Sequence, residues 1–254
     1  MPATYQSTQT LYDKSASCWA RNEPTSLSDF TARPAVLAMC EPVAESKILD
    51  LGCGEGYCSR ELMRRGAASV YGIDLSQGMI DAAQKQEQTD RLGIQYETRC
   101  AIELTHINSQ SFDQVLAVFL FNYLTVEQMT QCMQEVFRVL QPGGQFVFSV
   151  PHPAFPYMRA AEYPFFFDVG DAGYFSQQDQ QFQGRIWKRD GTWLGVQLVH
   201  KPLEAYFKAL ADAGFKTMPR VKELRVTPEH LKIDPDFFQP LFDYPLHLAI
   251  QISK

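Results

Sequence analysis

Three glycines at alternate positions, Gly52, Gly54 and Gly56, are the residues of this chain best suited to hold a ligand. They follow the short apolar run Ile48–Leu51, and a helical pattern begins near Tyr57. Glycine lets a backbone approach a ligand closely, and a helix start adds free N–H groups. The dinucleotide fingerprint would need a third glycine at position 57, where the sequence has tyrosine. The loop is therefore G-x-G-x-G. This pattern still predicts a small-molecule site, but it is not the dinucleotide fingerprint.

Two carboxylates stand on either side of this loop in the sequence. Asp50 lies inside the apolar run, and Asp74 lies 22 positions after Gly52, at the end of a second expected strand, Val70–Asp74. An acid about 20 residues beyond the glycines is where nucleotide-type α/β folds hold ribose hydroxyls. Ser76 is suited to cap the next helix. The sequence therefore predicts a nucleoside-like ligand between the loop and Asp74.

The elements that would position these residues alternate along the chain. Apolar runs predict strands over 48–51, 70–74, 94–98, 112–121, 146–150 and 246–252, and one starting at Phe215; helical spacing predicts helices near 34–40, 57–65, 76–83, 126–140 and 202–213. Strands that alternate with helices form a parallel sheet with right-handed crossovers. The expected fold is therefore α/β, a doubly wound Rossmann-like sheet with its ligand at the carboxyl ends of the strands.

Four segments occur in an order known from one enzyme family: Asp50–Gly56, Asp74, Phe112–Asp113 and Arg138–Gly144 before an apolar strand. In this succession the chain resembles the class I S-adenosylmethionine-dependent methyltransferases of the small-molecule type, with a type 11-like core. The similarity covers residues 34–150, and more loosely the C-terminal end. The resemblance implies a seven-stranded, mostly parallel sheet whose last strand is antiparallel. It also implies S-adenosyl-L-methionine as the cofactor.

The resemblance further implies a role for each residue of the cofactor site. The backbone of Gly52–Gly56 would pass the methionine and ribose parts, Asp74 would hold the ribose hydroxyls, and Asp50 would lie near the amino-acid end. The other implied contacts are Cys53, Leu75, Met79, Cys100, Ala101, Ile102 and Ala117. Where the family often has an acid after its third strand, this chain has Cys100, so backbone and apolar packing are expected to meet the adenine.

Residues 151–200 leave the regular pattern and carry eleven aromatic side chains between Phe155 and Trp193. Long insertions in α/β enzymes usually cover the substrate. We therefore expect an aromatic-rich lid and an apolar or planar small-molecule acceptor, with the lid's own core as the alternative role for individual rings. Residues 1–254 are expected to form a single domain, divided into a cap segment (1–33, with Tyr5 and Tyr12), a cofactor core (34–150), the lid (151–200) and the end of the core (201–254).

The expected chemistry needs no catalytic triad, and none is visible. Methyl transfer from a sulfonium is an in-line displacement, so the protein mainly binds, orients and excludes water. A hydroxyl or protonated amine acceptor would be helped by a general base, for which histidine titrates in the useful range. The candidates are His152, after the fifth strand, and His200, at the end of the insertion; holding the lid is their alternative role. Asn122 and Tyr123 follow the fourth strand, where they would orient the acceptor.

The remaining candidates are expected to be structural. His106, His230 and His247 are expected to be packed or exposed. Arg33 is expected to be a surface charge at a helix start, with a contact to the cofactor carboxylate as the less favoured role.

Composition limits the class of protein. A formal charge of −6 without a basic stripe argues against nucleic acid as a partner. The six cysteines are scattered, which favours reduced thiols in the cytoplasm over disulfides or a metal site. Neither a leader-like segment nor an apolar stretch of about 20 residues is present, so we expect no signal peptide and no membrane span.

The sequence thus favours an enzyme that moves a methyl group from S-adenosyl-L-methionine to a nitrogen or oxygen of a small, aromatic or otherwise apolar molecule. Two alternatives stay open. One is a nicotinamide-dependent oxidoreductase, against which Tyr57 and Pro142-Gly-Gly144 count. The other is a non-enzymatic protein that binds the cofactor for regulation.

Overall fold

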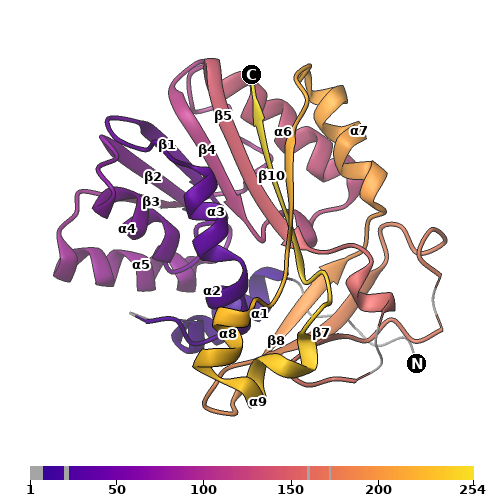
Figure 1. Ribbon diagram of the computed structural model, residues 1–254. Coiled ribbons are helices and arrows are strands. Elements are labelled where there is room, and N and C mark those ends of the chain that lie inside the picture. Colours follow the sequence, from indigo (N-terminus) through magenta and orange to yellow (C-terminus); the bar gives the residue numbers. More distant parts are fainter. Residues whose placement is uncertain (1–7, 20–22, 159–160, 172) are drawn as a thin grey trace.

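The computed structural model describes residues 8–19, 23–158, 161–171 and 173–254. Figure 1 shows a central sheet with helices on both faces and a smaller sheet beyond one edge. Tyr5 of the expected cap segment lies outside the described residues. The rest of that segment contains α1 (Thr8–Trp19) and the short α2 (Leu27–Thr31).

The central sheet has seven strands in the order β3-β2-β1-β4-β5-β10-β9. The strands are β1 (Lys47–Leu51), β2 (Ser69–Asp74), β3 (Gln95–Thr98), β4 (Phe112–Val118), β5 (Leu140–Pro151), β9 (Arg220–Leu224) and β10 (His247–Ser253). Neighbours from β3 to β5 are parallel, whereas β10 is antiparallel to both β5 and β9. The expected doubly wound sheet with an antiparallel last strand is confirmed.

Each face of the sheet has its own apolar core, because successive side chains of a strand point to opposite faces. Ile48 packs with Val36 and Leu62, from α3 (Arg33–Met39) and α4 (Tyr57–Arg64). Its neighbour Leu49 packs in the other core with Met133. That second core belongs to α6 (Val126–Val139) and α7 (Leu203–Ala213), while α5 (Gln77–Asp90) contacts β2 and β3.

The insertion after β5 forms a three-stranded antiparallel sheet of β6 (Phe165–Phe167), β7 (Gln181–Trp187) and β8 (Trp193–Val199). Its inner side packs against α2 and against two short helices near the C-terminus, α8 (Pro228–Ile233) and α9 (Pro235–Phe238). Much of the aromatic excess fills this third core, with Phe155 stacked on Phe165 at 4.9 Å. Figure 1 shows this sheet below the central one, across its lower edge.

Three expectations about the elements need correction. The strand expected over 112–121 ends at Val118, because Phe119 adopts a left-handed φ of 57° and a 3-10 turn, η1 (Phe121–Tyr123), follows. Phe215 starts no strand; its ring packs on Phe137 at 5.1 Å, and β9 begins five residues later, at Arg220. The strand expected over 146–150 begins at Leu140, so that Pro142-Gly-Gly144 lies within β5.

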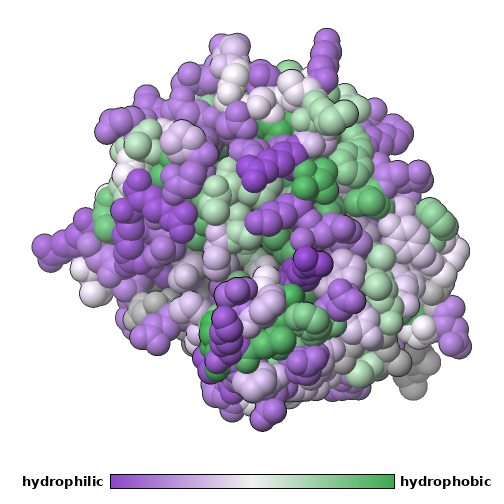
Figure 2. Space-filling model, in the orientation of Figure 1, coloured by the Kyte–Doolittle hydropathy of each residue, from purple (hydrophilic) through white to green (hydrophobic). Residues whose placement is uncertain are grey.

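The surface on the side drawn in Figure 2 is mixed. Hydrophilic side chains cover much of it, and apolar ones appear in separate areas between them. None of the helices in the described ranges is both long and apolar enough to cross a membrane.

Candidate functional site

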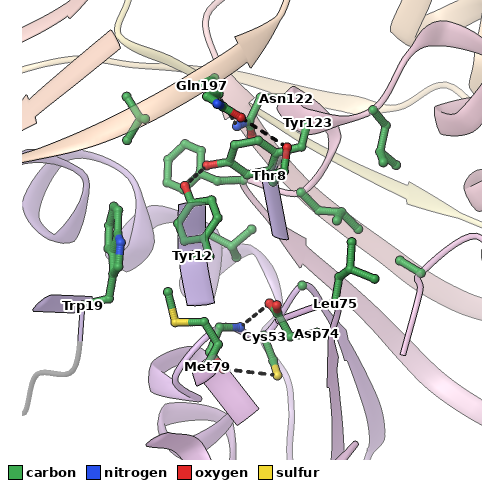
Figure 3. A pocket seen from close by; sticks show the side chains of 18 of the residues that line it. Thr8, Tyr12, Trp19, Cys53, Asp74, Leu75, Met79, Asn122, Tyr123 and Gln197 are labelled. Carbon is green, nitrogen blue, oxygen red and sulfur yellow. Dashed lines mark hydrogen bonds between the residues drawn. The ribbon is translucent and has the colours of Figure 1, made fainter. Parts of the chain in front are cut away.

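A cavity of about 340 Å³ opens at the carboxyl edge of the central sheet, where doubly wound folds bind ligands. That volume is at the lower end of the range usual for small-molecule sites. The cavity runs from the glycine loop after β1 to the inner face of the three-stranded sheet. Figure 3 looks into it: Asp74, Leu75 and Met79 lie on one side, and Tyr12, Tyr123 and Asn122 lie across from them.

The glycine loop folds back on β2 and leaves part of its backbone facing the cavity. The N–H groups of Gly52 and Cys53 donate to the carbonyl of Ile73, at 2.8 and 3.0 Å. Gly54 has a φ of 56°, and a Cβ built on it would have no heavy atom within 4 Å. Gly56 differs: a Cβ there would lie 2.3 Å from the Tyr96 hydroxyl oxygen, so this glycine serves packing beneath α4.

Asp74 connects the glycine loop to the start of α5. Its Oδ2 accepts from the Gly54 N–H and its Oδ1 from the Ser76 N–H, each at 2.9 Å. The expected cap is present, since Ser76 Oγ accepts from the Met79 N–H at 3.2 Å. Burial raises the pKa of the Asp74 carboxyl, and the two N–H groups oppose that rise. Each carboxylate oxygen keeps a lone pair for a ligand donor.

Asp50 lies deeper, beneath the loop. Its Oδ2 accepts from the Ser59 hydroxyl at 2.6 Å. Burial raises the pKa of Asp50 to about 7, and the Ser59 hydrogen bond opposes the rise. A cationic group placed beside Asp50 would favour its ionised form.

Most residues expected around the cofactor line the cavity, as do some that the sequence did not single out. Cys53, Leu75, Met79, Cys100, Ala101 and Ile102 are on its wall with Asp50, Gly52, Gly54 and Asp74. Ala117 and Gly56 are not; Ala117 is fully buried in the core, and the next residues in the chain, Val118 and Phe119, take the lining position.

Helix α1 closes one side of the cavity through the polar contacts of three of its side chains. Asp13 accepts from the Ser76 hydroxyl at 2.6 Å and from the Gly78 N–H at 3.2 Å. The hydroxyls of Tyr12 and Tyr123 are hydrogen-bonded, and Thr8 donates to Gln197 Oε1 at 3.3 Å. Figure 3 shows the hydroxyls of Tyr12 and Tyr123 pointing toward each other, on the side of the cavity away from Asp74. The N-terminal segment is thus part of the site.

Arg33 is not the surface charge that the sequence suggested. Its side chain is 12% exposed and lines the cavity. Its Nη1 donates to Asp29 Oδ1 and to Ser28 Oγ, both at 2.7 Å, and the guanidinium lies over the Phe119 ring at 5.6 Å. The buried helix α2 supplies both partners, which is why an isolated Arg-Pro in the sequence did not reveal the position.

The two histidines favoured as bases lie outside the lining. His152 is 7% exposed and its Nε2 is 3.1 Å from Glu223 Oε1. His200 donates from Nε2 to the Tyr174 carbonyl at 2.7 Å, between the rings of Tyr157 and Tyr174. His152 thus connects the end of β5 to β9, whereas His200 contacts two residues of the insertion. Tyr123 and Asn122 do line the cavity.

His247 is the histidine on the cavity wall. It opens β10, is 1% exposed, and its ring lies 5.1 Å from the Phe119 ring and 5.6 Å from the Phe165 ring. Phe165, Phe167, Ile186 and Val196 complete this apolar end of the cavity. One signal in the sequence could have found it: a polar residue at the start of an apolar strand that is antiparallel to the others.

The lining fits S-adenosyl-L-methionine, the cofactor that the resemblance implies. The open space at Gly54 admits a ligand against the backbone, and the lone pairs of Asp74 suit hydroxyl donors. Asp50 suits a cationic amino group. No group of three or more His, Cys, Asp or Glu side chains within the described ranges is placed to hold a metal ion.

Comparisons with known proteins agree with this fit. A family model described as a methyltransferase domain matches residues 48–144. A Haemophilus influenzae protein, whose name states no function, is 31% identical over 139 residues, 52% of this chain and 53% of its own length. A ubiquinone biosynthesis O-methyltransferase of Pseudomonas savastanoi pv. phaseolicola is 25% identical over 186 residues, 69% of this chain and 78% of that protein. Matches to the first curated relatives span 53%, 20% and 45% of their lengths, which is about half or less.

A solved structure extends the similarity to nearly the whole chain. The S-adenosylmethionine-dependent methyltransferase from Mesorhizobium loti superposes with a TM-score of 0.65 at 28% identity, covering 87% of this chain and 96% of that one. Together with the glycine loop, Asp74 and the strand order, these similarities identify a methyltransferase domain of the class I S-adenosylmethionine-dependent type in this chain, matched over residues 48–144, with S-adenosyl-L-methionine as its cofactor.

Proposed function

We propose that this chain transfers a methyl group from S-adenosyl-L-methionine to an oxygen or nitrogen of a small, largely apolar molecule, as a single-domain enzyme of the cytoplasm. The observation that carries the proposal is the continuity of one cavity from the glycine loop to the aromatic wall of the second sheet. The cofactor brings an activated methyl group. The chain's own part is to bind both molecules, orient them and exclude water.

The residues divide into two groups in this proposal. The loop Gly52–Gly54 and Asp74 hold the nucleoside part, and Asp50 with Arg33 faces the charged amino-acid end. Tyr123 and Asn122 orient the acceptor, and the rings of the second sheet enclose it. The name of the Pseudomonas relative, an O-methyltransferase, supports oxygen as the atom that is methylated. Free cysteines throughout the described chain support a reducing compartment.

The first test is calorimetric titration with S-adenosylhomocysteine, with NAD and NADP as controls. Binding of the first alone supports the proposal and justifies screening acceptors by mass spectrometry of the trapped methyl group. Binding of a nicotinamide nucleotide, or of none of the three, would contradict it. Cofactor binding without methyl transfer to any member of a metabolite pool would favour a regulatory, non-enzymatic role.

A second test addresses Asp74. Asp74→Asn preserves size but removes the charge, so affinity for adenosine should fall by about 10- to 100-fold, as expected for charge-assisted hydrogen bonds of about 1.5–3 kcal/mol. Affinity for 2′,3′-dideoxyadenosine should not depend on the substitution. Asp81→Asn, on the exposed side of α5, is the matched control. Equal losses for both nucleosides would mean that Asp74 only orders the loop through the Gly54 N–H.

A further inference from the structure

His247 has one ring nitrogen whose role the fold does not explain. Its Nε2 lies 3.1 Å from Thr31 Oγ1, and that hydroxyl donates its only hydrogen to the Leu27 carbonyl, at 2.9 Å. Thr31 must therefore accept from His247, so Nε2 carries the proton. Burial and then the positive charge of Arg33 lower the pKa of His247 to about 3, which keeps the ring neutral. In a neutral ring protonated at Nε2, the other nitrogen, Nδ1, is a bare acceptor.

This Nδ1 is buried and has no hydrogen-bond partner among the described residues. Buried polar atoms are nearly always paired, because an unpaired one loses its hydration without compensation. His247 belongs to the cavity wall, so the cavity is the direction from which a partner can come. A neutral acceptor selects for a ligand atom that donates, and it disfavours a carboxylate, carbonyl or ether oxygen at that point.

The position of His247 separates it from the cofactor end. In the strand order, β10 is three places from β1, which carries the glycine loop. Three strand spacings are about 14 Å across the sheet. Around His247 the wall is aromatic, with Phe119 and Phe165 edge-on or tilted to its ring. The second molecule in the cavity is therefore the one that meets this nitrogen.

We propose that His247 Nδ1 accepts a hydrogen bond from a hydroxyl group of the methyl acceptor, and that the acceptor is a planar, phenol-like molecule packed against Phe119, Phe165 and Phe167. The inference rests on the proposed function and adds its substrate class. A phenol joins a hydroxyl donor to a flat apolar body, which matches the bare nitrogen and the surrounding rings. His247 thus contacts the acceptor, whereas Arg33 and Asp50 face the cofactor.

Two substitutions separate this contact from the packing of β10. His247→Gln keeps an amide N–H that can donate to Thr31 and carries no acceptor at the Nδ1 position. His247→Asn does the reverse, because its amide oxygen reaches the Nδ1 position but its side chain is too short for Thr31. His106→Gln is the matched control, since His106 lies beside Tyr71 and Glu97 and outside the cavity lining.

The experiment uses the whole chain saturated with S-adenosylhomocysteine and titrated with 2-naphthol or 2-methoxynaphthalene. Wild type, His247→Asn and His106→Gln should prefer naphthol, and His247→Gln should lose about fivefold in naphthol affinity with methoxynaphthalene unchanged. Long-range ¹H–¹⁵N spectra of histidine-labelled protein should show the Nδ1 signal of His247 shifting with naphthol only.

Several results would overturn the inference. They are naphthol affinity that is unchanged in His247→Gln, equal losses for the two probes, an Nδ1 signal that does not move, and no saturable binding of naphthol to wild type. Each applies to protein that binds S-adenosylhomocysteine, so the proposed function would survive it. Failure to bind S-adenosylhomocysteine at all would instead refute the proposed function.

Discussion

Gly54 offers the sharpest test of where the cofactor passes. Alanine at this position would keep a φ of 56° and add a methyl group to open cavity. An L-residue in the left-handed region costs about 1–2 kcal/mol, which lowers the Tm by about 2–8 °C in a protein of this size. If the cofactor lies along the loop, the methyl group also overlaps it. Overpacking costs about 1–3 kcal/mol, so affinity for S-adenosylhomocysteine should fall by about 5- to 150-fold.

Gly143 provides a control with the same backbone strain. Its φ is 79°, a Cβ there also meets nothing within 4 Å, and it lies in the exposed first part of β5, outside the cavity lining. Gly143→Ala should lower the Tm as Gly54→Ala does but leave the calorimetric affinity for S-adenosylhomocysteine unchanged. If the two variants bind the ligand equally well, the cofactor does not pass Gly54 and the proposed cofactor site is wrong.

Three other variants test the surroundings of the site. Burial raises the pKa of Asp50 to about 7, so the folded chain holds a proton that the unfolded chain releases, and stability falls as pH rises from about 4 to 7. Asp50→Asn should gain stability over wild type across that interval, by up to roughly 4 kcal/mol; urea unfolding at pH 4 and pH 8 that gives a constant difference would contradict this. Tyr12→Phe removes the hydrogen bond between the Tyr12 and Tyr123 hydroxyls, so amide hydrogen exchange in residues 8–19 should accelerate. Tyr71→Phe is the control: it removes a hydrogen bond to Glu97 and should not change exchange in that helix. His152→Ala should leave affinity for S-adenosylhomocysteine within about twofold, because the two hydrogen-bond partners of its ring, the exposed Glu223 and the Ala154 N–H, both lie outside the cavity lining; a larger loss would place it in the site.

The sheet could be predicted because its signals are local and repeated. Continuous apolar runs such as Val115–Ala117 indicate strands that are buried on both faces of a sheet. Helical spacing such as that of Met129, Met133 and Val136 identifies the helices that cover those faces. The end of β4 could not be predicted, because Phe119 continues the apolar run yet takes a left-handed φ. Phe215 misled for a similar reason: hydrophobicity marks burial, and a buried ring can follow a helix without a strand.

The cofactor end of the site was also accessible from sequence, because its chemistry sits on the first strands and their turns. Asp50, Gly54 and Asp74 are fixed by the loop itself and lie where the spacing put them. Parts of the cavity wall that come from outside these strands depend on long-range packing. Arg33 reaches the cavity because Asp29 of α2 pairs with its guanidinium, and no sequence pattern predicted α2.

The choice of histidine shows what topology adds to such an interpretation. Ligands bind at the carboxyl ends of parallel strands, which favours a residue just after β5, and His152 meets that criterion. An antiparallel strand, however, presents its beginning at the same edge, so the first residue of β10 borders the cavity as well. Pro151 is paired with His247 across the two strands, and paired residues share a face. Pro151 lines the cavity, so His152, one residue further along, points to the opposite face and contacts Glu223, while His247 faces the cavity. Once the last strand is known to be antiparallel, the alternation of a single strand pair decides between the two histidines.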